Sequence, residues 1–190
     1  MSLDTIRHYF TEANNALEQF LSEEKNFKNI NAAGNLMVDA LRNGNKIISC
    51  GNGGSMCDAM HLAEELAGKF REDRKPLAAI AISDPSYITC VGNDYGFDKI
   101  FTRFVEGNGR KGDILFAIST SGNSKNVLAA AEMAREKEMI IIGLTGKDGG
   151  FLAPLCNVEI RAPQCQYADH SQEIHIKIIH SLILFIEGNM

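Results

Sequence analysis

Four side-chain hydroxyls lie within the six residues Ser119-Thr120-Ser121-Gly122-Asn123-Ser124. An apolar run, residues 114–118, precedes them and an alanine-rich helical pattern, residues 123–137, follows. Hydroxyls and unpaired backbone N–H groups at the start of a helix can surround a phosphate. Ordinary N-capping is the simpler alternative, but it requires one hydroxyl and not four. The loop therefore indicates a phosphate site, and it is not a P-loop because no Gly-Lys-Ser/Thr sequence is present.

A glycine-rich turn, Gly51-Asn52-Gly53-Gly54-Ser55, likewise lies between an apolar run and a helical pattern. Glycines allow positive φ and close approach of a ligand to the main chain, and the N–H groups that follow can hold an anion or a polar sugar. The dinucleotide fingerprint fits poorly, because its third glycine falls on Met56 and the only nearby acidic strand end, Asp84, comes too late. A purely structural turn remains the alternative.

Two pairs of polar side chains follow helical spacing. His61 and Glu65 are four residues apart, an offset of about 40° and about 6 Å, so they share one helix face. Gln172 and His180 lie on another helical pattern, eight residues and about 12 Å apart, which strains the idea of one shared ion. Glu173 is a rival ligand to Gln172. Converging imidazoles and a carboxylate would form a metal or acid–base site, whereas a single buried histidine is more often structural.

The other histidines and the cysteines near the first turn receive plainer interpretations. His170 and His175 suit solvated or supporting roles, and His8 is expected at the surface. Cys50 and Cys57 are expected to be small buried hydrophobic residues.

The elements that position these groups alternate between strand and helix. Strands are predicted at 47–50, 78–82, 114–118, 139–144 and 158–160, and helices at 55–70, 98–106, 123–137 and 171–186. A short helical piece follows the second strand, and residues 92–96 are predicted as a loop. This order predicts a three-layer αβα sandwich around a five-stranded parallel sheet. Two amphipathic helices, residues 6–21 and 30–41, precede the first strand.

The unusual turns, residues 51–55, 83–85, 119–124 and 145–150, all follow predicted strands. Ligands of such sheets bind at the carboxyl ends of the strands, so these loops are expected to form one composite site.

Composition favours one domain over residues 1–190, with a helical segment at 1–44 for oligomer contacts and an α/β core at 45–190. The chain has 190 residues, 45% of them hydrophobic and 23% charged, with a net charge of −5. No basic stripe predicts a nucleic-acid partner, and the longest apolar run is too short to cross a membrane. No secretory signal is visible at Met1-Ser2-Leu3-Asp4. Five cysteines without a Cys-x-x-Cys pair favour the cytoplasm.

The motifs together resemble a known family. Cys50 to Ser55, His61-Leu62-Ala63-Glu64-Glu65, Val91 to Asp94, the serine loop and Leu144 to Gly150 are similar to the sugar isomerase (SIS) domain family, and Ala168-Asp169 with Gln172 to His175 extends the match over essentially the whole chain. Within that family they resemble the bacterial phosphoheptose isomerases. The resemblance implies a flavodoxin-like SIS fold and conversion of sedoheptulose 7-phosphate to D-glycero-D-manno-heptose 7-phosphate for lipopolysaccharide heptose. It also implies a cytoplasmic homotetramer with sites at subunit interfaces.

The resemblance also assigns site residues. The phosphate would be bound by Ser119, Thr120, Ser121 and Ser124. The sugar would be lined by Asn52, Gly53, Gly54, Ser55, Glu65, Asn93, Asp94, Asp169 and Gln172. The acid–base pair would be Glu65 and His180. One weakly held zinc per subunit would be bound by His61, Glu65, Gln172 and His180.

A rival function of a different class shares the fold. Some SIS domains regulate rather than catalyse, binding a phosphosugar or a replication-initiator protein. Such a protein should lack the acid–base pair. Glu65 and His180 are both present here, which favours the isomerase.

Overall fold

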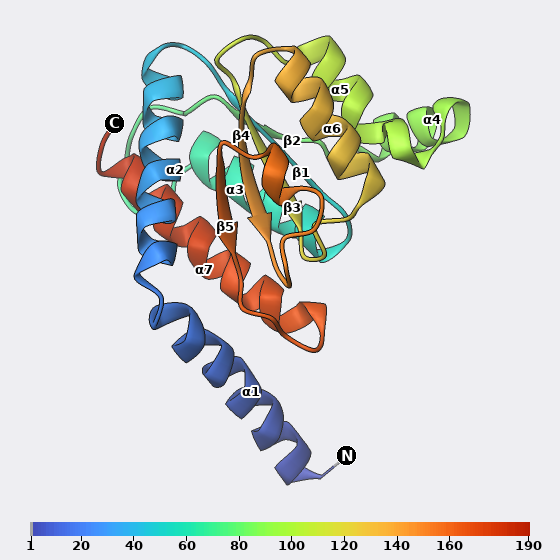
Figure 1. The fold of residues 1–190 in the computed structure, drawn as a ribbon. Helices are drawn as coiled ribbons and strands as arrows, with labels where there is room; N and C mark the ends of the chain where they lie inside the picture. Colours follow the sequence, from blue (N-terminus) through green and yellow to red (C-terminus); the bar gives the residue numbers. More distant parts are fainter. Residues whose placement is uncertain (1) are drawn as a thin grey trace.

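The computed structural model describes residues 2–190, and its centre is a five-stranded parallel sheet (Figure 1). The strands run in the order β2-β1-β3-β4-β5, and every neighbouring pair is parallel. This is the flavodoxin-like order, so the predicted fold class is confirmed. The bounds are β1 (Ile47–Gly51), β2 (Ala79–Ala81), β3 (Ile114–Ser119), β4 (Ile140–Thr145) and β5 (Val158–Arg161).

Helices cover both faces of the sheet and divide the core into two layers (Figure 1). On one face pack α2 (Glu24–Arg42), α3 (Gly54–Ala67) and α7 (Ala168–Glu187). On the other pack α4 (Pro85–Tyr95), α5 (Ile100–Asn108) and α6 (Lys125–Glu136), with short 3₁₀ turns at Phe97–Lys99 and Ala153–Leu155. The alternation of strand side chains produces this division: Phe116 faces the first layer, and its neighbours Leu115 and Ala117 face the second.

The first helix, α1 (Leu3–Leu21), extends away from the body (Figure 1). The Ser2 hydroxyl caps it by accepting from Thr5 N at 3.2 Å. Ala16 and Phe20 are buried near its C-terminal end, whereas Leu3 is 72% exposed and Phe10 69% exposed. The predicted amphipathic helix is therefore present, with much of its apolar stripe uncovered by its own chain.

Some element boundaries differ from the sequence prediction. The second helix begins at Glu24 and not near residue 30. The predicted loop at 92–96 is mostly helix, since α4 continues through Gly92 to Tyr95. The Asp84 carboxylate caps α4 by accepting from Tyr87 N at 2.7 Å, and Pro85 supplies a helical φ at its first turn. Gly96, at φ 91°, ends it.

No helix in residues 2–190 combines the length and apolarity needed to cross a membrane.

Candidate active site

Because the strands are parallel, the loops after β1, β3 and β4 emerge at one edge of the sheet (Figure 1). These are the glycine loop (residues 51–55), the serine loop (residues 119–124) and the loop that we name the bracing loop (residues 146–152). The helix α3 begins within the glycine loop, at Gly54, and α6 begins directly after the serine loop, at Lys125. The composite site expected from the turns is thus topologically possible within one chain.

The hydroxyls of the serine loop are held by the loop itself and not by the helix that follows. Ser119 Oγ and Ser124 Oγ lie 3.0 Å apart, and Ser121 Oγ accepts from Asn123 N at 3.1 Å. Ser124 is the N-cap residue of α6, yet its side chain makes no capping bond within the described chain. Ser124 therefore leaves the N–H groups of the first two residues of α6 without a side-chain cap, whereas Val127 N donates to Asn126 Oδ1. Uncapped N–H groups beside several hydroxyls are what a phosphate site needs.

The bracing loop supports the serine loop from one side. Leu152 N donates to Gly122 O at 3.0 Å, and Phe151 N donates to Asn123 Oδ1 at 3.2 Å. Gly122 adopts φ 65°, and a β-carbon there would overlap the carbonyl of Gly149. Glycine is required at residue 122 by both the φ angle and the close approach of the two backbones.

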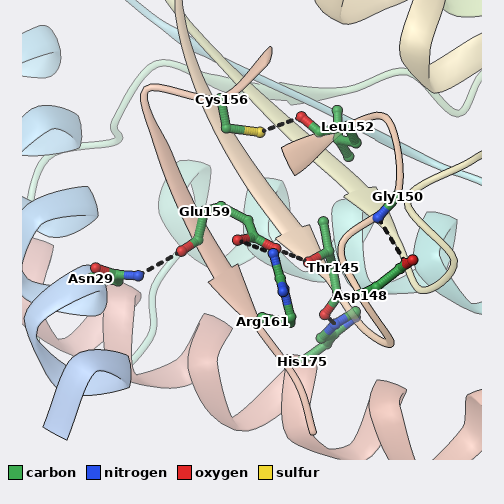
Figure 2. A network of polar contacts seen from close by, with 9 residues as sticks. All are labelled: Asn29, Thr145, Asp148, Gly150, Leu152, Cys156, Glu159, Arg161 and His175. Carbon is green, nitrogen blue, oxygen red and sulfur yellow. Dashed lines mark hydrogen bonds and ion pairs between the residues drawn. The ribbon is translucent and has the colours of Figure 1, made fainter. Parts of the chain in front are cut away.

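A polar network lies behind the bracing loop (Figure 2). The Glu159 carboxylate accepts from Arg161 Nε at 2.7 Å and Arg161 Nη2 at 2.8 Å, and also from the Thr145 hydroxyl. The Glu159 carbonyl accepts from Asn29 Nδ2 at 2.8 Å, and this hydrogen bond joins α2 to β5. A β-carbon at Gly149 would overlap the Glu159–Arg161 pair, so the pair packs directly against the bracing loop.

The glycine loop is fixed by two contacts. Asn52 and Asn126 exchange two amide hydrogen bonds, each 2.8 Å long. Gln172, on α7, packs against Gly54 so closely that a β-carbon there would overlap its amide. Asn126 was missed by the sequence analysis, and the only available signal was its position two residues after Ser124.

His61 and Glu65, about two and three turns along α3, converge with His180 of α7. The Nε2 atoms of His61 and His180 lie 2.9 Å apart, and Glu65 Oε1 lies 3.7 Å from His61 Nε2. Glu64 lies 3.2 Å from the other ring nitrogen of His61. The His180 ring also stacks on Phe70, with centroids 5.8 Å apart. Partial burial, together with repulsion from His61, holds the pKa of His180 below its usual value, so its imidazole is neutral at neutral pH.

These donors suit zinc, with one exception. Two imidazole nitrogens and a carboxylate oxygen are typical zinc ligands, and both Nε2 lone pairs can be directed at one cation. Gln172 lies beside Gly54, seven residues before His61, which is about 10 Å along the helix axis. Within the described chain, the ligand atoms of His61, Glu64 and Glu65 all lie within 4.8 Å of one another, and His180 adds an imidazole nitrogen 2.9 Å from His61. Gln172 lies instead beside the start of α3.

The other predicted sugar contacts are scattered. Ser55 is buried, and Asp169 lies in the first turn of α7, where its carboxylate accepts from His170 N at 2.9 Å. Asn93 and Asp94 are exposed on α4, which projects from the body away from α7 (Figure 1). In the described chain they do not join the cluster.

Three interpretations from the sequence need correction or confirmation. Cys57 is exposed and not buried, whereas Cys50 is buried as expected. His170 and His175 are both buried, which excludes a solvated role. His170 packs on the Tyr9 ring, with centroids 4.6 Å apart. His8 is exposed, as predicted.

His175, on α7, is hydrogen-bonded to the last residue of β4, next to the bracing loop. Its Nε2 donates to Thr145 O at 2.8 Å, and its Nδ1 has no partner among the described residues. Burial lowers the pKa of His175 from 6.5 to about 4. Between these two values the unfolded chain binds the proton and the folded chain does not, so the free energy of unfolding falls as the pH drops through this window.

We expect that loss to reach about 2 kcal/mol between pH 7.5 and pH 5. Urea unfolding in the presence of a chelator, at both pH values, measures it. His175→Gln should flatten the pH dependence, and His8→Gln, at an exposed position, should leave it as in the parent. Equal slopes in the parent and His175→Gln would contradict the assignment.

Comparison with known proteins agrees with this geometry. Residues 8–146 match the family model of the SIS domain. The chain is 55% identical to the phosphoheptose isomerase of Aeromonas salmonicida, over 100% of this chain and 99% of that protein. Its structure is similar to a phosphoheptose isomerase from Francisella tularensis (TM-score 0.93, 40% identity, 99% of each chain). The same holds for phosphoheptose isomerase GmhA from Neisseria gonorrhoeae (TM-score 0.90, 39% identity, 97% of this chain and 98% of that one).

Full-length identity at this level, together with the loops and the His–Glu–His cluster, shows that the chain belongs to the phosphoheptose isomerase family of SIS-domain proteins.

Proposed function

We propose that this chain converts sedoheptulose 7-phosphate to D-glycero-D-manno-heptose 7-phosphate, and so supplies heptose for lipopolysaccharide. The observation that carries the proposal is the Glu65 carboxylate beside two imidazoles, on the helix that starts from the glycine loop. Appearance of the aldose phosphate from sedoheptulose 7-phosphate, followed with the purified chain, tests it. Binding without any aldose product would refute it.

The chemistry requires a base and an acid. Ketose-to-aldose isomerisation moves a proton between C1 and C2 through an enediol, and both oxygens need partners as the charge shifts. Glu65 is the base that takes the carbon-bound proton and returns it to the neighbouring carbon. His180 is neutral, and its ring exchanges protons with the oxygens. Zinc bound by His61, Glu65 and His180 would polarise those oxygens.

The non-catalytic alternative, a regulator that binds a phosphosugar or a replication-initiator protein, needs only the serine loop. It gives no reason for two imidazoles 2.9 Å apart with a carboxylate 3.7 Å from one of them. The isomerase accounts for both groups of residues.

Loss of a hydroxyl from the serine loop should weaken substrate binding. For Ser121→Ala and Ser124→Ala we expect KM to rise by roughly tenfold to a hundredfold with kcat nearly unchanged, because a hydrogen bond to a charged phosphate contributes about 1.5–3 kcal/mol in ground and transition states alike. Steady-state kinetics measures both values. Ser22→Ala, at an exposed residue that follows the C-terminal end of α1, is the control. An unchanged KM in both variants would reduce the loop to a structural turn.

We propose that the chain forms a homotetramer, in the cytoplasm, with sites shared between subunits. The exposed apolar stripe of α1 supports assembly, since Leu3 and Phe10 have no cover from their own chain. The exposed positions of Asn93 and Asp94 support shared sites, because only another subunit could bring them to the cluster. All five cysteines are free, which suits a reducing compartment.

Assembly is tested by light scattering at micromolar concentration. We expect a mass of four chains for the parent and a smaller mass for Phe10→Asp, since a charge on the apolar stripe opposes burial. Thr11→Asp, on the polar side of the same helix, should remain tetrameric. A monomeric parent would exclude the tetramer.

A further inference from the structure

Asn126 is a buried polar residue to which the proposed mechanism gives no part. It lies in the first turn of α6 and is only 2% exposed. Its Nδ2 donates to Asn52 Oδ1 and its Oδ1 accepts from Asn52 Nδ2, both at 2.8 Å, across 74 residues of sequence. Its Oδ1 also accepts from Val127 N at 3.0 Å. A buried amide with this many partners has one fixed orientation.

The restraint runs from α6 to the glycine loop. Asn126 is anchored in a helix in which Val127 and Ala130 are fully buried. Asn52 is instead flanked by Gly51 and Gly53, and Gly53 adopts φ 55°. Two glycines leave the backbone around Asn52 with many accessible conformations, so its side chain needs an external partner to hold one position.

We propose that Asn126 is a positioning residue that fixes the Asn52 amide for the sugar hydroxyls, and so makes the glycine and serine loops one rigid site for a single phosphosugar. This inference rests on the proposed function, in which the serine loop binds the phosphate. The inference goes beyond the proposed function because it assigns a role in substrate specificity to a residue that does not itself contact the ligand.

The hydrogen-bonding capacity of Asn52 shows why the orientation matters. A side-chain amide has two N–H donors and two acceptor lone pairs. Asn126 occupies one donor and one acceptor of Asn52, which leaves one of each. A sugar hydroxyl both donates and accepts, so this remaining pair suits a polyol. Rotation of the amide would break both bonds to Asn126 at once.

The test compares two ligands by calorimetry: inorganic phosphate, and heptitol 7-phosphate, the reduced substrate, which cannot isomerise. For Asn126→Ala we expect the Kd of heptitol 7-phosphate to rise about tenfold, as for the loss of an oriented hydrogen bond. The Kd of inorganic phosphate should change less than about twofold, because the bracing loop still holds the serine loop.

A double-mutant cycle separates positioning from general stability. In the Asn52→Ala background, Asn126→Ala should have no further effect on heptitol 7-phosphate binding, because Asn126 acts only through Asn52. An equal tenfold loss in both backgrounds would overturn the proposal, as would an unchanged Kd in the single variant. If Asn126→Ala fails to fold, Asn126→Asp replaces it in the test. This variant keeps the size of the side chain but cannot donate to Asn52 Oδ1. Its negative charge affects both phosphate-bearing ligands, so the ratio of the Kd of heptitol 7-phosphate to the Kd of inorganic phosphate cancels that effect.

The measurement needs no turnover, so it is distinguishable from the test of the proposed function. A parent that binds heptitol 7-phosphate without isomerising sedoheptulose 7-phosphate refutes the reaction and leaves the Asn126 result intact. A parent that binds inorganic phosphate and heptitol 7-phosphate equally well overturns the Asn126 proposal, since no sugar contact then exists to be positioned.

Discussion

Replacing Glu65 with glutamine should reduce kcat by about 10²- to 10⁴-fold, the range for loss of a general base. The amide keeps the size and polarity of the carboxylate but cannot accept the proton from carbon. KM should change little, because the phosphate anchor in the serine loop is untouched. Exchange of the substrate C1 proton with deuterated solvent, followed by NMR, measures the same step directly and should stop in this variant.

The neighbouring Glu64 provides a matched control. It lies on the same helix and also contacts His61, at 3.2 Å, but from the opposite ring nitrogen and with a side chain that is 65% exposed. We expect Glu64→Gln to lose less than about tenfold in kcat, as for a residue that orients and does not react. The reverse outcome, an active Glu65→Gln and an inactive Glu64→Gln, would move the base to Glu64.

Most of the fold could be predicted because its signals are local. Residues 114–118 and 140–144 are continuous apolar runs, as parallel strands buried on both faces must be, and each ends in a turn rich in glycine or serine. The alternation with helices then allows few topologies. Boundaries such as the extent of α4 were missed because Gly92-Asn93-Asp94 has the composition of a turn, whereas the Asp84 cap and Pro85 favour continuation of the helix.

The site was predictable only where its residues share an element. His61 and Glu65 follow from helix periodicity, and the hydroxyls of the serine loop are contiguous. The Asn52–Asn126 pair could not be inferred, because it depends on how closely two loops approach across the sheet edge. The meeting of His61 with His180 likewise depends on how α3 packs on α7. The spacing of Gln172 and His180, about 12 Å along a straight helix, agrees with the place of Gln172 beside Gly54, at the start of α3.

The zinc proposal predicts that removal of the ion abolishes activity. His61 Nε2 and His180 Nε2 lie 2.9 Å apart, so one cation between them could accept a lone pair from each ring. We expect dialysis against a chelator to inactivate the parent and added zinc to restore it. Binding needs deprotonated ligands, so zinc should be lost as the pH falls and the imidazoles protonate.

The metal content of variants tests the zinc proposal directly. His61→Ala and His180→Ala should each lose the ion, measured by mass spectrometry of the dialysed protein, and should stay inactive when zinc is added, because each removes one of three donors. His8→Ala, at an exposed histidine remote from the cluster, should keep both metal and activity. Gln172→Ala should retain zinc if the three donors of one chain suffice, and should lose it if the amide of another subunit completes the site. Full activity of a parent freed of metal would leave Glu65 and His180 as an acid–base pair that works without an ion.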